Sequence, residues 1–316
     1  MQNFKKAPYL HLGNYKAPQG ENFIFIPMKD KIKIRLAYWR QSKPVEECRG
    51  TILLQQGHNE FIEKYYETIQ ELINRNFNVV CFDWRGQGMS DKIIDNQNKQ
   101  YIEDFSIHSS DLNYIINEII TNNFPSPLIG IGHSMGGHLL LLGQEKNQSN
   151  FKSIILSAPM LGFRQEKFLF LLSSLAKLFL KKDAFFPFSK PNMGKETAFE
   201  DNDLTSDPNR YKRTQELVRK NPNIRLWGIT NAWVNAVKDS LNKIRKKKWY
   251  NNIKTPIIII NPLKDRVVDA TKTQKMADNL PNCKIYNINN IEHEILMEKD
   301  QHRRKFWEIF DRFFCS

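Results

Sequence analysis

The chain has 316 residues and a formal net charge of +13, with 41% hydrophobic and 12% aromatic residues. This length is enough for one large α/β domain with an insertion, or for two small domains. No apolar run reaches the roughly 18 residues that span a bilayer, and the polar, proline-interrupted start does not match a signal peptide. We therefore expect a cytoplasmic protein, and its basic surface leaves peripheral contact with the anionic inner membrane face open.

The cysteines exclude two further classes of protein. Cys48, Cys81, Cys283 and Cys315 lie far apart and lack C-x-x-C spacing, which predicts neither a zinc site nor a disulfide framework. No segment resembles a nucleic-acid fold with interleaved aromatic residues. We expect no metal ion, no organic cofactor and no nucleic-acid partner.

The first half of the chain alternates strand patterns with helix patterns. Residues 23–27 and 32–40 predict an antiparallel hairpin that turns near Lys29 and Asp30. Residues 51–55 and 79–83 read as buried strands, with a helical segment between them. A further helix with one apolar stripe is expected over residues 106–121.

The second half continues this alternation after an interruption. Strands are expected at residues 128–131, 153–158, 256–260 and 284–288, and an amphipathic helix at 301–314. Such alternation predicts an α/β fold with a mostly parallel sheet and helices on both faces. No clear strand occurs between Pro159 and Pro256, so we interpret residues 162–249 as an inserted helical cap. Residues 1–161 and 250–316 then form the core.

Two segments of this cap each allow two interpretations. Residues 168–180 read FLFLLSSLAKLFL, which is too short to cross a membrane. The segment either lies in a membrane interface or roofs an apolar pocket, and we favour the roof because a core-facing helix is the commoner fate. The basic run at residues 245–248 is expected to be a solvated helix end, with attraction to anionic lipid as the alternative.

One pentapeptide, Gly132-His133-Ser134-Met135-Gly136, fits the pattern G-x-S-x-G between a strand and a helix. In such a turn the serine adopts a positive φ, and Gly132 and Gly136 give the backbone room. The helix N-terminus behind the serine favours developing negative charge. We predict Ser134 as a nucleophile; the alternative is a glycine-rich turn with an idle serine.

A serine nucleophile requires a base and a carboxylate that orients the base. The chain order Ser, acid, His is the one expected for this turn, and both partners should follow strands. Asp265 and His293 meet both conditions. Asp269 is the alternative acid, but it is expected one turn into the following helix.

Hydrolysis also requires donors for an oxyanion. We predict the backbone N–H of Met135 as one donor and that of His58 as the other, with Gly57 permitting close approach. Replacing the His58 side chain should therefore matter less than replacing Ser134.

Seven stretches together resemble the α/β-hydrolase fold, and within it the lysophospholipase and monoacylglycerol lipase branch that is often grouped with serine aminopeptidase-like hydrolases. They read QGHNEFIEKYYETI, FDWRGQGMSD, GHSMGGH, LSAPMLG, LTSDPNRY, DRVVD and HEILME. The resemblance is closest to lysophospholipase L2-like proteins. It implies a sheet of about eight strands and hydrolysis of a single-chain lipid ester through an acyl-enzyme. The chain departs from the lipase pattern at Gln56, where a histidine is usual, and at Asn59, where a second glycine is usual.

Other functions remain open at this point. A monoacylglycerol lipase or a general esterase would use the same nucleophile. A serine aminopeptidase would need an acidic group in the cap for the substrate amine, and four acidic residues qualify: Glu196, Glu200, Asp201 and Asp203. The non-enzyme alternative is a hydrolase-fold protein that binds lipid without turnover.

Overall fold

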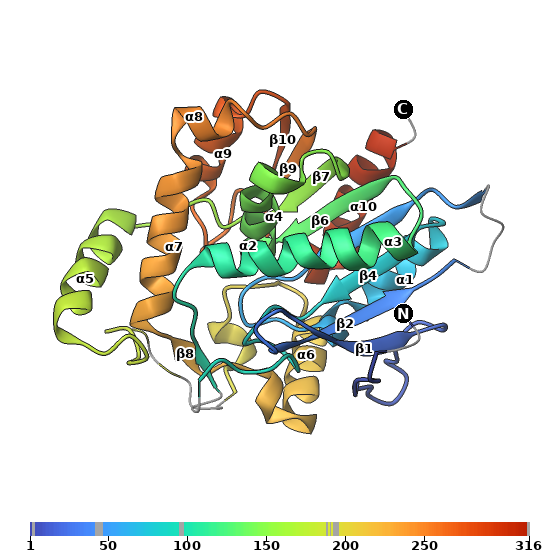
Figure 1. Ribbon diagram of the computed structural model, residues 1–316, viewed down its shortest axis with the longest axis horizontal. Coiled ribbons are helices and arrows are strands. Elements are labelled where there is room, and N and C mark those ends of the chain that lie inside the picture. Colours follow the sequence, from blue (N-terminus) through green and yellow to red (C-terminus); the bar gives the residue numbers. More distant parts are fainter. Residues whose placement is uncertain are drawn as a thin grey trace.

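The computed structural model describes residues 1, 4–41, 47–94, 98–187, 189, 191 and 196–314. Eight strands form one sheet in the order β1-β2-β4-β3-β6-β7-β9-β10 (Figure 1). Their bounds are β1 Asn22–Pro27, β2 Lys33–Trp39, β3 Thr51–Gln55, β4 Asn78–Phe82, β6 Leu128–His133, β7 Phe151–Ser157, β9 Ile257–Pro262 and β10 Cys283–Ile288.

The predicted hairpin and parallel core are both confirmed. Strand β1 pairs antiparallel with β2, with Ile24 opposite Leu36, and β2 pairs antiparallel with β4. The remaining pairs, from β4 through β3, β6, β7 and β9 to β10, are parallel. Strands β3, β4, β6 and β9 are buried along their whole length, because helices cover both faces of a parallel sheet.

Helices pack on both faces of the sheet. Side chains from α1 and α10 join one apolar core, and side chains from α2, α4 and α9 join the other. Their bounds are α1 Tyr66–Asn74, α2 Phe105–Tyr114, α4 Ser134–Asn147, α9 Ala270–Asn279 and α10 Asp300–Phe314. A short 3-10 helix at Ile62–Tyr65 precedes α1, and a π-helical segment at Ile115–Ile120 joins α2 to α3, Thr121–Asn123.

Between β7 and β9 the chain leaves the main sheet and forms mostly helices (Figure 1). These are α5 Glu166–Phe179, α6 Pro208–Lys220, α7 Asn231–Ile244 and α8 Lys247–Tyr250, with short 3-10 helices at Phe199–Asp201 and Pro222–Ile224. Strand β8, Gly228–Ile229, pairs with β5, Lys99–Gln100, in a separate two-stranded sheet. This pairing ties the insertion to the loop that precedes α2.

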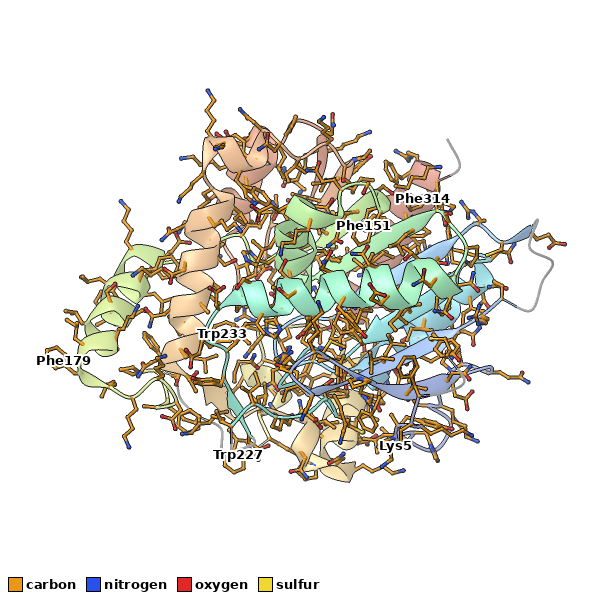
Figure 2. The ribbon with its side chains drawn as sticks, viewed as in Figure 1. Lys5, Phe151, Phe179, Trp227, Trp233 and Phe314 are labelled. Atoms are coloured by element: carbon orange, nitrogen blue, oxygen red, sulfur yellow. The ribbon has the colours of Figure 1, made fainter. Side chains whose placement is uncertain are left out.

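Helix α5 does not roof an apolar pocket, so that expectation is wrong. Figure 1 shows α5 at the edge of the molecule, on the outer side of α7, and Figure 2 shows Phe179 at this edge. Phe179 is 81% exposed and Leu178 is 74% exposed. The side of α5 with the small residues Ser173 and Ala176 is buried instead, which lets the helix pack closely on α7.

The four residues of the basic run at 245–248 have different environments. Lys246, Lys247 and Lys248 are exposed, as expected for a solvated helix end. Arg245, in contrast, donates to the Glu166 carboxylate, with 2.8 Å between Nη1 and Oε1. The run therefore contributes both a link between α7 and α5 and a cationic surface.

Two further sequence predictions concern disulfide bonds and membrane-spanning helices. Cys48, Cys81 and Cys283 are free thiols, and Cys315 lies outside the described residues. Within the described part of the chain, no helix combines the length and apolar composition required to cross a bilayer.

Candidate active site

The turn between β6 and α4 holds Ser134 in the predicted strained conformation. Its φ is +49°, in the left-handed region that side chains rarely adopt. The turn is crowded: a Cβ on Gly136 would lie 2.5 Å from the Gln56 carbonyl oxygen, and a Cβ on Gly132 would lie 2.7 Å from the Gly137 Cα. Glycine at both positions therefore lets β6, α4 and the loop after β3 meet closely around Ser134.

The loops after two neighbouring strands bring Asp265 and His293 to this turn. Asp265 follows β9, and His293 follows β10, next to it in the sheet. His293 Nδ1 lies 2.6 Å from Asp265 Oδ2, and His293 Nε2 lies 3.0 Å from Ser134 Oγ. Because the carboxylate accepts from Nδ1–H, Nε2 is left to accept the serine hydroxyl proton.

The three side chains are almost fully buried, with 7% of Ser134, 1% of Asp265 and 3% of His293 exposed. Burial alone lowers the pKa of His293, but the charge and hydrogen bond of Asp265 outweigh it and raise this pKa above its ordinary value. Asp265 is itself held by the backbone N–H groups of Val267 and Val268, at 2.7 Å and 2.9 Å from Oδ1. The imidazole is therefore fixed in orientation and stabilised in its protonated form.

The alternative acid has a different task. Asp269 is the N-cap of α9, rather than a residue one turn inside it, and its Oδ1 accepts from the Thr271 amide at 3.0 Å. Its side chain is thereby committed to the helix end.

The loop after β3 has one free amide at the position predicted for an oxyanion donor. The N–H of Gly57 donates to Glu60 Oε2, and the N–H of Asn59 donates to Gln87 Oε1. Between them, the N–H of His58 has no acceptor among the described residues. Met135 lies in the first turn of α4, where amides lack a partner four residues earlier. These two amides can both serve an oxyanion.

Asn59 links this loop to the insertion. Its Oδ1 accepts from the Leu226 N–H at 2.7 Å, and its Nδ2 donates to the Leu226 carbonyl at 3.2 Å. Asn59 also has a φ of +59°, a conformation that glycine adopts without strain. The His58 ring packs on Trp233 of α7, with 4.9 Å between ring centroids. Residues of the insertion thus hold His58 and Asn59 in place.

A buried charged cluster lies beside His293, and sequence reasoning did not assign it. Lys64 Nζ lies 2.5 Å from Glu60 Oε1 and 2.6 Å from Glu294 Oε1. Burial raises the pKa of Glu60, but Lys64 outweighs this effect and lowers it to about 2. Burial raises the pKa of Glu294, which Lys64 only partly offsets. The stretches QGHNEFIEKYYETI and HEILME contained all three residues, yet nothing in their spacing indicated that they meet.

The same cluster resembles a metal site only in part. Ligand atoms of Glu60, His133 and Glu294 lie within 4.8 Å of one another. Lys64, however, bonds both carboxylates and supplies the positive charge that a cation would bring. Burial also lowers the pKa of His133 to about 3, which keeps this ring neutral.

The segment after β4 forms hydrogen bonds that stabilise the loop after β3. Asp83 accepts from the Ile62 N–H at 3.0 Å and from Gln56 Nε2 at 3.0 Å, so it orders the loop after β3. Arg85 pairs with Asp111 of α2 at 2.7 Å. These contacts give the FDWRGQGMSD stretch a structural role beside the site.

A cavity of about 230 Å³ opens beside Ser134 and His293. The insertion contributes five of its lining residues: Leu204, Thr214, Gln215, Val218 and Arg225. The four acidic residues considered for an amine do not line it. Two of them have basic partners, since Glu196 pairs with Arg219 and Asp203 pairs with Arg266.

The fold and this site define a serine hydrolase of the α/β-hydrolase class. Residues 46–300, well over half of the chain, match the family model described as serine aminopeptidase, S33. The chain belongs to this family.

The chain is similar along its whole length to a probable lysophospholipase L2 of Haemophilus influenzae, with 28% identity over 98% of each chain. Lysophospholipase L2 of Escherichia coli is 24% identical over 87% of this chain and 82% of its own. Among solved structures, a soluble variant of monoglyceride lipase from Saccharomyces cerevisiae, in complex with a substrate analogue, has a TM-score of 0.73. It is 18% identical and covers 97% of this chain and 99% of its own, a likeness of fold alone.

Proposed function

We propose that this protein is a carboxylic ester hydrolase that acts on a single-chain lipid, with a lysophospholipid as the leading substrate class. In this proposal residues 1–161 and 250–316 form the hydrolase core, and residues 162–249 form the cap over the site. Ser134, His293 and Asp265 are the catalytic residues, and the amides of His58 and Met135 form the oxyanion hole.

The first half of the reaction is acyl transfer to the enzyme. Ser134 Oγ attacks the acyl carbonyl carbon while its proton passes to His293 Nε2, 3.0 Å away. The carbonyl oxygen becomes an oxyanion that accepts from the two backbone amides. When the tetrahedral intermediate collapses, the bond to the glycerol oxygen breaks, and His293 gives its proton to that oxygen.

The second half returns the enzyme to its starting state. A water molecule loses a proton to His293 Nε2 as its oxygen attacks the acyl carbonyl carbon. Collapse of the second intermediate breaks the bond to Ser134 Oγ, which recovers its proton from His293. The products are a fatty acid and the deacylated glycerol compound.

The observation that carries this proposal is the continuous contact from Asp265 through His293 to Ser134 at 2.6 Å and 3.0 Å. The substrate class is supported by the names of the relatives that match along most of the chain. A monoacylglycerol lipase or a general esterase would use the same residues, so only turnover distinguishes them.

The peptidase and binding-protein alternatives receive less support. Both glutamates in the cavity are already bonded to Lys64, which leaves neither of them free to hold a substrate amine. A binding protein without turnover would not require a hydrogen-bonded serine, histidine and aspartate at an oxyanion hole.

The test is turnover of p-nitrophenyl esters with short and long acyl chains, of a lysophospholipid, and of an aminoacyl anilide. We expect hydrolysis of the lysophospholipid and of long-chain esters, with at least about a 10⁴-fold loss of kcat in Ser134→Ala. Activity on the anilide alone would replace the proposal with an aminopeptidase. Tight lipid binding with no turnover of any substrate would favour the binding protein.

We also propose that α5 brings the enzyme to an anionic lipid surface. Phe168 and Leu171, at 60% and 58% exposed, extend the apolar face that includes Leu178 and Phe179. Lys181 follows this face directly and is exposed, as is Lys182, which pairs with Glu103 at 2.7 Å. A basic residue close to a charged bilayer contributes about 1 kcal/mol, so apolar insertion and charge attraction would act together here.

A further inference from the structure

The cavity beside Ser134 contains two cationic side chains whose surroundings differ. Lys64 bonds Glu60 and Glu294, so its positive charge is already compensated by carboxylate partners. Arg225, on the cap side, also lines the cavity, yet it forms no ion pair with any carboxylate in the described part of the chain. One side of this small cavity therefore has a compensated cation, and the other side has a cation without a carboxylate partner among the described residues.

Arg225 is held in place without being neutralised. It follows the 3-10 helix Pro222–Ile224, and its Nη1 donates to Gln215 Oε1 at 2.8 Å. Gln215 lies on α6 and is itself only 7% exposed, so it fixes the guanidinium. A guanidinium has five N–H donors, and this is the single side-chain hydrogen bond of Arg225 among the described residues. Several donors remain for a ligand.

The surroundings of Arg225 favour an anion. The side chain is partly buried, and burial lowers its pKa, although its charge persists at neutral pH. Glu196, the acidic residue that acts on it at longer range, already pairs with Arg219. Two arginines outside this cavity, in contrast, have carboxylate partners: Arg85 pairs with Asp111, and Arg245 pairs with Glu166. An anionic group in the cavity would offset the free-energy cost of burying the Arg225 charge.

We propose that Arg225 binds the phosphate of a lysophospholipid headgroup while the acyl carbonyl of the same molecule lies at Ser134. This inference rests on the proposed ester hydrolase function and adds the residue that selects the headgroup. In a lysophospholipid the glycerol backbone links the phosphate to the acyl ester, so both groups of one molecule can lie in the same cavity. Arginine suits this role because its planar fork bonds two phosphate oxygens at once. On the opposite side Lys64 is already bonded to Glu60 and Glu294, which disfavours a phosphate there.

The first experiment compares kcat/KM on a lysophospholipid and on a monoacylglycerol with the same acyl chain, both below their critical micelle concentrations. In Arg225→Gln we expect the lysophospholipid-to-monoacylglycerol ratio to fall about 10- to 100-fold, since hydrogen bonds to charged groups are lost. Arg225→Lys should lose part of this ratio, because it retains charge without the bidentate geometry. The matched control is Lys212→Gln, a cationic residue of α6 outside the cavity with a 71% exposed side chain, which should leave the ratio unchanged. An equal loss on both lipids in Arg225→Gln would overturn the assignment.

The second experiment separates binding from catalysis. Ser134→Ala is titrated with an ether-linked lysophospholipid and with the matching glycerol ether, with and without Arg225→Gln. We expect the added substitution to weaken the phosphate-bearing ether at least about 10-fold more than the glycerol ether. Equal weakening would refute the headgroup role. If the wild-type protein hydrolyses neither lipid, the proposed function fails, and this titration still decides the role of Arg225.

Inorganic phosphate distinguishes a lipid headgroup from a free anion. We expect it to compete with the ether lysophospholipid only weakly, because the acyl chain supplies most of the apolar contact. Phosphate binding as tight as that of the ether, and lost in Arg225→Gln, would make this a free-anion site and overturn the proposal. Far-UV circular dichroism and the melting temperature of each variant show that the chain remains folded.

Discussion

Helices α4 and α5 both contain leucine-rich sequence, yet they have opposite environments. Leu139, Leu140 and Leu141 of α4 are fully buried, because α4 lies between the sheet and α2. Leu178 of α5 is 74% exposed, since α5 has α7 as its packing partner. The comparison teaches that apolar composition alone does not place a helix in the core. In the proposed enzyme, the packed helix holds the nucleophile and the exposed helix meets the lipid.

The largest effect is expected from a substitution in the buried site beside α4. Asp265→Asn should lower kcat about 10³- to 10⁴-fold on a soluble short-chain ester, because the imidazole loses its orientation and its charge partner. The base must be neutral, so kcat/KM of the wild type should fall as pH drops through the raised pKa of His293. Removing the carboxylate lowers that pKa and should shift the acidic limb to lower pH. If the acidic limb of the kcat/KM profile lies at the same pH in Asp265→Asn as in the wild type, Asp265 does not act on His293.

A pair of leucine truncations sharpens the comparison directly. Leu140→Ala in α4 should lower the free energy of unfolding by about 2–5 kcal/mol, because it leaves a cavity between the sheet and the helices. Leu178→Ala in α5 should change it by less than about 0.5 kcal/mol. Urea denaturation of both variants measures the two values. Similar losses would mean that α5 is packed in solution.

Asn59 connects the two regions, so Asn59→Gly should uncouple them. Glycine tolerates the φ of +59° but removes both hydrogen bonds to Leu226. We expect kcat on a long-chain ester to fall about 3- to 10-fold, because the His58 amide is less firmly held. Asn59→Asp, which keeps the acceptor for the Leu226 N–H, is the matched control and should lose less. An unchanged kcat in Asn59→Gly would show that the cap does not position this amide.

The smallest effect on catalysis is expected on α5. Leu178→Asp combined with Phe179→Asp should lower binding to vesicles that contain an anionic phospholipid at least about 10-fold, because charged groups resist insertion. Hydrolysis of a soluble short-chain ester should stay within about 2-fold of the wild type. Tyr9→Ser, at an exposed aromatic residue far from α5 in the sequence, is the control and should bind as the wild type does. Vesicle cosedimentation at low and high salt measures the effect, and unchanged binding would remove α5 from the membrane contact.

Local sequence determined the core of the fold and the residues that meet at the proposed site. Strand periodicity, the G-x-S-x-G turn and the order of Ser134, Asp265 and His293 are short-range signals, because each depends on neighbours in the chain or on strand ends that share one sheet edge. The hairpin, the parallel strands and the positive φ of Ser134 followed from these signals.

Only the tertiary structure decided how the insertion meets the core. The contact of Asn59 with Leu226, the bond of Lys64 to Glu294, and the shared cavity of Ser134 and Arg225 bring together residues that are far apart in the chain. No periodicity encodes such contacts. The same reason explains why α5 was misplaced. Its sequence specifies an apolar helix, but whether that helix is buried depends on the neighbours that the rest of the fold supplies.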